Sequence, residues 1–181
     1  EIFPDKKFGL DDGELELDDM MEVLEAESFN VTKDYQGLVS KKVNADIAQG
    51  LKQGMSGDEI IALVRKDMPD LTDRWIDTLV RTKTTEMFNR GRKNYWETDE
   101  FAKQIVEAYQ FSAIMDERTS EVCASLDGNV YEKGEFTNHI VPPLHFNCRS
   151  LLVPITKFEE YEAEKPPSLD SLKEKGGNLM I

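Results

Sequence analysis

The sequence is poor in the residues that define several classes of protein. Among 181 residues there are two cysteines and two histidines, too few cysteines for a disulfide-stabilised scaffold. No apolar run approaches the roughly 20 residues that a membrane-spanning helix needs, and the N-terminus shows no basic patch followed by an apolar stretch, as a secretory signal would. The sequence therefore favours a soluble protein with no membrane partner, whose cysteines stay reduced.

Basic residues are also scarce. Lys and Arg number 22 against 36 Asp and Glu, which gives a formal net charge of −14. Between Asp11 and Glu27 lie nine acids and no base, a block that repels polyanions and is typical of a solvated face or an interaction tail. Because nonspecific DNA affinity comes mainly from Lys and Arg neutralising phosphates, the composition disfavours a DNA-coating protein. The chain begins with Glu1 rather than methionine, so we expect a longer parent chain.

Hydrophobic periodicity predicts helices in the first half of the chain. Within residues 1–37, apolar side chains recur at helical spacing among the acids, which indicates an acidic arm with a short amphipathic helix. That helix either packs on this chain or docks on another protein. Three further helices are expected near residues 39–53, 56–68 and 72–95, the second opened by a capping box. The apolar stripe of the last helix comprises Trp75, Ile76, Leu79, Val80, Met87 and Phe88.

After Glu97 the pattern changes to one that predicts strands. Alternate positions from 105 to 113 are rich in aromatic and apolar residues, and shorter strands are expected at 129–132 and 151–155. The predicted fold class is α+β, with an N-terminal helical lobe followed by a small, mainly antiparallel sheet and a loop-rich knot. The predicted divisions are the acidic arm 1–37, a domain 38–157 and a flexible acidic tail 158–181.

The densest cluster of unusual residues lies in two short polar segments. These are DERTSEVCASLDG at 116–128 and PPLHFNCRS at 142–150, which we call together the loop knot. Asp116 and Arg118 flank a turn, where a guanidinium can hold a carboxylate through two parallel hydrogen bonds. Polar segments separated by an insertion often meet around one site, so we expect the two segments to fold against each other. The residues assigned to this structural knot are Asp116, Arg118, Thr119, Cys123, Asp127, Gly128, His145, Cys148 and Arg149.

The loop knot holds three side chains of the type that zinc prefers: Cys123, His145 and Cys148. The spacing of the last two suits two ligands on one turn. A structural zinc needs four protein ligands, for which Asp116 or His139 would be the fourth, whereas a water there would give a site of catalytic type. The alternatives are a buried histidine and two packed thiols without a metal cofactor, and a Cys123–Cys148 disulfide.

The same three residues raise the alternative of an enzyme. Cys123 or Cys148 as nucleophile and His145 as base would make a metal- or cysteine-dependent hydrolase. However, no nucleophile-elbow motif or papain-type signature surrounds either cysteine, and the glycines form no phosphate-binding loop. The sequence therefore favours a protein that is not an enzyme.

A basic segment at residues 81–96 stands out in this acidic chain. It contains five bases and a single acid, Glu86, with aromatic residues interleaved. A DNA-contacting face is one interpretation; favourable charges near a helix C-terminus and salt bridges to the acidic arm are the other. Arg81 and Asn89 could also hydrogen-bond the backbone of the loop knot. The candidate nucleic-acid contacts are Arg81, Arg90, Arg92 and Lys93.

Taken in order, these segments resemble the Mu F-like phage head morphogenesis domain, over about residues 55–155. The paired motifs of the loop knot are the specific part of this resemblance, and the helical part is less distinctive. The residues that carry it are Arg81-Thr82, Asn89, Gly91, Tyr109, Asp116-Glu117-Arg118-Thr119, Cys123, Leu126-Asp127-Gly128, Pro142-Pro143-Leu144-His145 and Asn147-Cys148-Arg149.

The resemblance implies a minor head protein of a phage virion, assembled in the bacterial host cytoplasm. Residues 38–157 would form the head morphogenesis domain, with portal and capsid or scaffold proteins as partners and a role near the portal. Such a protein would also aid DNA packaging or delivery, with DNA itself as a weak binding partner. The same domain occurs fused to toxin modules, but nothing after Ile155 is long enough to be one.

This chain departs from the family pattern at two positions. Many relatives carry cysteine where Ser120 and Ser150 stand, and with those residues the family site would be a four- or five-ligand metal knot. With serine at both positions this ligand set is incomplete, and the shared loop architecture could survive without metal, held by Asp116, Arg118, His145 and Arg149.

Overall fold

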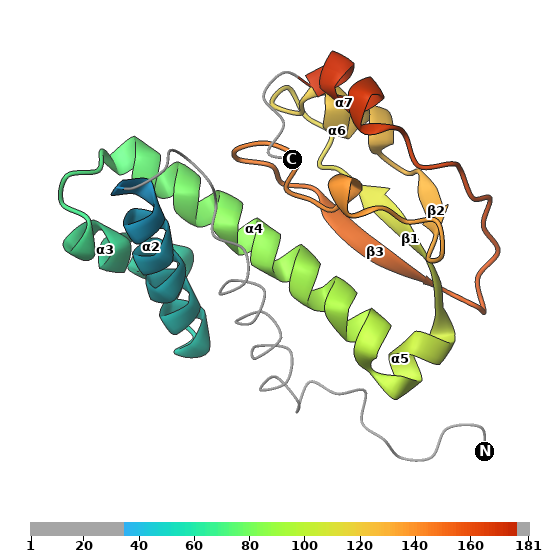
Figure 1. Cartoon of the computed structure of the whole chain (residues 1–181), viewed down its shortest axis with the longest axis horizontal. Coiled ribbons are helices and arrows are strands. Elements are labelled where there is room, and N and C mark those ends of the chain that lie inside the picture. Colours follow the sequence, from blue (N-terminus) through green and yellow to red (C-terminus); the bar gives the residue numbers. More distant parts are fainter. Residues whose placement is uncertain (1–34, 177–181) are drawn as a thin grey trace.

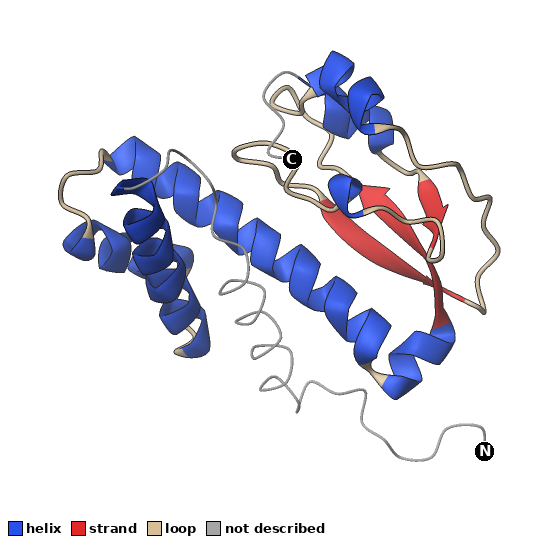
Figure 2. Ribbon diagram, in the orientation of Figure 1, coloured by secondary structure: helices blue, strands red, loops and turns tan. Residues whose placement is uncertain are grey.

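The computed structural model describes residues 35–176 as a helical lobe joined by one long helix to a small sheet (Figures 1 and 2). The predicted arm and its amphipathic helix, within residues 1–37, lie almost wholly outside the described residues.

The α+β class is confirmed. The helices are α2 (Tyr35–Lys52), α3 (Gly57–Asp67), α4 (Asp73–Thr98), α5 (Glu100–Ile105), α6 (Glu121–Leu126) and α7 (Leu169–Gly176), with a 3-10 turn at Asn138–Ile140; the strands are β1 (Val106–Ser112), β2 (Val130–Glu132) and β3 (Leu151–Thr156). None of the helices within residues 35–176 is both long and apolar enough to cross a membrane.

The helical lobe is formed by α2, α3 and the first half of α4. Ser56 opens α3 with the predicted capping box: its hydroxyl accepts from the Glu59 N–H while the Glu59 carboxylate accepts from the Ser56 N–H. Helix α2 approaches α3 closely at Gly50, where a Cβ atom would lie 2.5 Å from Ile60 Cγ1. The core of this lobe consists of Val43, Ile47, Ala48, Ile60, Val64, Ile76, Val80 and Met87.

Helix α4 leaves the lobe and runs alongside the sheet, and there the predicted apolar stripe is partly wrong. Trp75 and Phe88 are exposed, whereas the polar side chains of Thr82 and Asn89 are buried. Since α4 packs first on helices and then on the loops and edge of the sheet, the residues that face inward change in character along its length. A single apolar stripe cannot describe both halves.

The sheet has the order β2-β1-β3 and is antiparallel throughout. Strand β1 is central, and Tyr109 and Phe111 face the core as predicted. An irregularity in register between Val106 and Ala108 leaves Glu107 exposed, although the alternation placed it on the same face as Tyr109. The core on this face also includes Val122, Cys123, Leu126, Tyr131, Ile140, Leu144, Cys148 and Leu152.

Strand β3 is an edge strand whose outward-facing amides are occupied or absent. The Leu152 N–H donates to the Asn89 side-chain oxygen on α4 (2.8 Å), and the Thr156 N–H donates to Glu159 (2.8 Å). Between them stands Pro154, which has no N–H to offer. This edge is therefore closed to pairing with another strand.

The prediction of a flexible tail is wrong for residues 169–176. These residues form α7, which packs on α6, and Leu172 is buried in the core beside the sheet. Proline and glycine flank this helix, and their density in the sequence obscured the single apolar side chain that anchors it. The limits assigned to the three divisions of the chain stay predictions.

We expect Asn89→Ala to destabilise the protein by about 2–3 kcal/mol, measured by urea unfolding. The Asn89 amide donates to the Ser150 carbonyl and accepts from the Leu152 N–H, so its loss leaves two buried backbone groups without a partner. Asn94→Ala is the control, because this half-buried side chain of the same helix bonds none of the described residues. Equal effects of the two substitutions would contradict the assignment.

Candidate functional site

The first segment of the loop knot is a turn that leads into α6. The Arg118 N–H donates to the Asp116 carboxylate (2.9 Å), and the Asp116 N–H donates to the Thr119 hydroxyl (2.9 Å). That hydroxyl in turn donates to the Ile114 carbonyl. Ser120 then caps α6 by accepting from the Cys123 N–H (3.3 Å), which places Cys123 within the first turn of the helix. The local sequence alone explains this part of the site.

The second segment is held against α4. Asn147 has a positive φ of 57°, and its N–H donates to the Thr82 hydroxyl on α4 (2.9 Å). The Cys148 N–H donates to the His145 carbonyl (3.1 Å), so the chain makes a tight turn between these two residues. As the spacing predicts, the turn brings the side chains of His145 and Cys148 to the same side.

An ion pair joins the two segments. The Arg149 guanidinium forms two hydrogen bonds with the Asp116 carboxylate, one of them of 2.8 Å between Nη1 and Oδ2. The sequence suggested Arg118 for this role; its largely exposed guanidinium lies 3.6 Å from the Asp116 carboxylate, an ion pair without a hydrogen bond, and Arg149 makes the two hydrogen bonds instead. The pKa of Asp116 is held well below its ordinary value, first by the bond from Arg149 and then by the Arg118 N–H.

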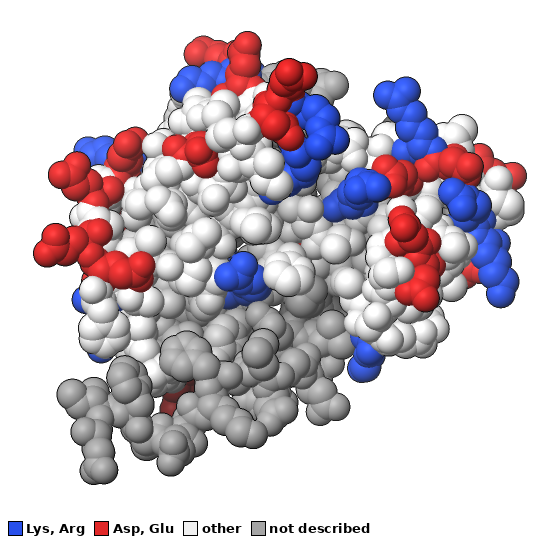
Figure 3. Space-filling model, turned by 180° about the vertical axis from the view of Figure 1, so that it is seen from behind, with Lys and Arg blue, Asp and Glu red and all other residues white. Residues whose placement is uncertain are grey.

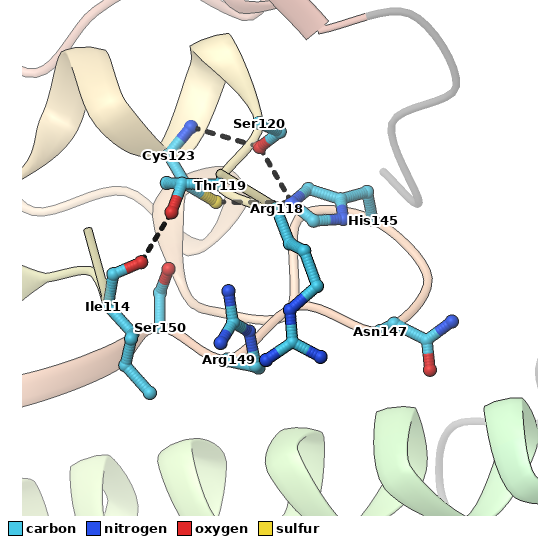
Figure 4. A pocket seen from close by; sticks show the side chains of 9 residues that line it. All are labelled: Ile114, Arg118, Thr119, Ser120, Cys123, His145, Asn147, Arg149 and Ser150. Carbon is cyan, nitrogen blue, oxygen red and sulfur yellow. Dashed lines mark hydrogen bonds between the residues drawn. The ribbon is translucent and has the colours of Figure 1, made fainter. Parts of the chain in front are cut away.

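Five of the nine predicted knot residues line one pocket: Arg118, Thr119, Cys123, His145 and Arg149. Figure 4 shows its lining, with side chains from both segments pointing toward one another. Asp127 and Gly128 serve elsewhere: the Asp127 carboxylate accepts from the Ala113 N–H (2.7 Å), and Gly128 turns the chain at a φ of 80°. They brace the end of α6 against β1. The lining residues are Ile114, Arg118, Thr119, Ser120, Cys123, His145, Asn147, Arg149 and Ser150.

The Cys123 thiol and the His145 imidazole line the pocket, and the Cys148 thiol lies next to that of Cys123. Cys123 Sγ lies 3.2 Å from His145 Nε2 and 3.7 Å from Cys148 Sγ. Both cysteines are free, with 3% and 2% of their surface exposed, so the disulfide that the sequence left open as an alternative is not formed. The suggested fourth ligands lie outside this group: Asp116 binds Arg149, and His139 bonds the Pro167 carbonyl (2.9 Å).

Ser120 and Ser150 stand beside the three ligand-type side chains. Ser120 Oγ lies 2.8 Å from His145 Nε2, and Ser150 is a buried residue in the lining of the same pocket. Both positions at which relatives carry cysteine thus lie beside Cys123 and His145. The sequence spacing predicted that Cys123, His145 and Cys148 lie close together. It gave no indication that these two serines lie beside them.

The geometry gives the cysteine-nucleophile hypothesis no support. A nucleophilic cysteine must be a thiolate that a substrate can reach. The pKa of Cys123 is raised, first by its hydrogen bond with Cys148 and next by burial, which keeps it a thiol at neutral pH. The pKa of Cys148 is lowered by its bond with Cys123, but its sulfur is buried.

The basic segment of α4 does not form one cationic face. At about 100° per residue, Arg90 lies on the opposite side of the helix from Arg81 and Arg92. Arg81 pairs with Asp77 (2.9 Å) and Lys93 with Glu97 (2.7 Å), while Arg90 lies 3.5 Å from Glu86 and Arg92 rests on the Trp96 ring. Seen from behind, the coloured residues of Figure 3 show basic side chains interspersed with acidic ones. Of the two residues expected to reach the loop knot, Asn89 does so and Arg81 does not.

Together these features define an α+β protein with two loops locked into one rigid cluster. Residues 41–153 match the family described as phage Mu protein F like protein, and the chain belongs to that family. It is accordingly a phage protein of head morphogenesis, a minor structural component of the virion head. No curated protein and no solved structure matches the chain.

We expect Arg149→Gln to lower the urea midpoint at pH 7, and the loss to shrink below about pH 4. Because the folded pKa of Asp116 is depressed, its ion pair stabilises the protein above the unfolded pKa and stops doing so as the carboxylate protonates in the folded state. Arg118→Gln is the comparison and should have a smaller effect, since its guanidinium is largely exposed and, at 3.6 Å from Asp116, lies beyond hydrogen-bond distance. A midpoint difference that persists unchanged to pH 3 would argue against this ion pair.

Proposed function

We propose that this chain acts in head assembly by docking on the portal protein through a rigid surface beside the loop knot. Because the chain belongs to a family of head-morphogenesis proteins, we expect its partner to be another protein of the phage head. The observation that carries the proposal is a group of exposed apolar side chains next to the best-fixed part of the molecule. These are Ile114, Met115 and Leu151, the last of which is paired through Ser112 with the end of β1.

The rigidity of the underlying loops favours docking at this place. The ion pair of Arg149 and Asp116, the Asn147 bond to α4 and the Asn89 bonds to β3 hold the backbone on three sides. A surface that is already ordered loses little conformational entropy when a partner binds. Exposed apolar side chains at its rim supply the area that binding removes from water.

We expect the double substitution Met115→Glu and Leu151→Glu to abolish co-purification with portal protein from phage-producing cells. Placing two charges in an apolar contact makes burial unfavourable. Phe101→Glu is the matched control: Phe101 is 62% exposed, as Met115 is 58%, but lies in α5, at the opposite end of β1. Normal co-purification of the double variant, or equal loss with Phe101→Glu, would refute the docking surface. If the chain co-purifies with capsid or scaffold protein instead of portal protein, portal protein is not the partner of this surface.

The proposed portal-side position also implies a part in DNA packaging or delivery, with assembly in the host cytoplasm. Heads made without this chain should contain less DNA or deliver it poorly. Particle yield, DNA content and infectivity of a deletion phage measure this, with the gene supplied in trans as the control. Particles that assemble, fill and infect normally without the chain would count against the whole assignment.

A further inference from the structure

We propose that Cys123, His145 and Cys148 bind one zinc ion, which cross-links the two segments of the loop knot. Their Sγ and Nε2 atoms all lie within 4.8 Å of one another. Two come from the tight turn at 145–148 and the third from α6. Thiolate and imidazole are the donors that zinc prefers. This inference does not depend on the docking function.

The separation of the two sulfurs fits a shared ion. Two thiolates at about 2.3 Å from a tetrahedral zinc lie about 3.8 Å apart, and the observed Sγ–Sγ distance is 3.7 Å. A disulfide would require about 2.05 Å, and hence movement of the backbone or side chains. The two sulfurs thus lie at nearly the separation that zinc would impose.

The histidine is already oriented as a ligand. His145 Nδ1 lies 2.9 Å from the Phe146 carbonyl, which can only accept, so Nδ1 carries the proton. In the neutral imidazole Nε2 then has a free lone pair, and Nε2 is the atom that faces the two sulfurs. A backbone carbonyl that fixes the tautomer is the usual outer partner of a zinc-bound histidine.

The fourth position falls to the Ser120 hydroxyl. Ser120 Oγ lies 2.8 Å from His145 Nε2, and the space beyond it is the pocket lined by Thr119 and Arg118. A hydroxyl is a weaker ligand than thiolate. The site should therefore bind zinc less tightly than a site closed by four protein side chains, and a thiolate at position 120 should strengthen it.

The test uses the full chain, purified under reducing conditions and stripped of metal. We expect one zinc per chain by elemental analysis after zinc addition, and a higher melting temperature with zinc. Cobalt in its place should show thiolate charge-transfer bands and the d–d bands of tetrahedral coordination. Less than about 0.1 zinc per chain, with no effect of zinc on melting, would overturn the proposal, since a site on folded protein must stabilise it.

Variants separate binding at this site from binding elsewhere. His145→Ala and Cys148→Ser should each weaken zinc binding at least about 100-fold. The control is His139→Ala, because the chain's other histidine bonds the Pro167 carbonyl away from the cluster. If His145→Ala binds zinc like the parent, or His139→Ala loses it while its circular dichroism is unchanged, the assigned ligands are wrong.

A substitution that increases zinc affinity gives a test that misfolding of a variant cannot mimic. Ser120→Cys should tighten zinc binding at least about 10-fold, because a thiolate replaces the hydroxyl at the fourth position. A variant that merely disturbs folding cannot produce this result. Failure of Ser120→Cys to tighten binding would exclude position 120 from the coordination sphere and contradict the proposed geometry. Portal co-purification is scored separately, so this proposal and the docking proposal fail independently.

Discussion

The position of α4 against the start of β3 is the constraint on which the site depends. Thr82 and Asn89 are seven residues apart and lie on the same face of the helix. Thr82 accepts from the Asn147 N–H, and Asn89 accepts from the Leu152 N–H. Since buried polar groups must find partners, the helix can take only one register along these loops. The His145-to-Cys148 turn therefore has a fixed location before any partner or ion binds.

The same face explains why the bases of α4 do not gather on one side of the helix. A helix that contacts backbone with Thr82 and Asn89 directs its remaining charged side chains around its other sides. There, acids within one turn neutralise several of them: Asp77 pairs with Arg81, and Glu97 pairs with Lys93. Pairs of this kind stabilise a long helix that crosses between two cores. The excess of bases thus has a structural explanation.

The blocked edge of β3 and the rigid loops beside it both bear on how this protein contacts other head proteins. A protein that works among many copies of other head proteins must avoid indiscriminate strand pairing. Asn89, Pro154 and Glu159 remove the free amides of β3, so the molecule offers partners side chains rather than backbone there. The apolar rim at Met115 and Leu151 lies beside this closed edge, which favours one defined contact over general adhesion.

Features set by near neighbours could be predicted from the sequence: the helical and strand periods, the capping box at Ser56, the turn at Asp127-Gly128 and the close spacing of His145 and Cys148. These follow from backbone geometry over a few residues. Only the tertiary structure decided that Arg149 rather than Arg118 grips Asp116, and that Leu172 anchors a helix in the C-terminal segment. Partners separated by 33 residues, as Asp116 and Arg149 are, meet only once every intervening element is packed. No local pattern in the sequence encodes that choice.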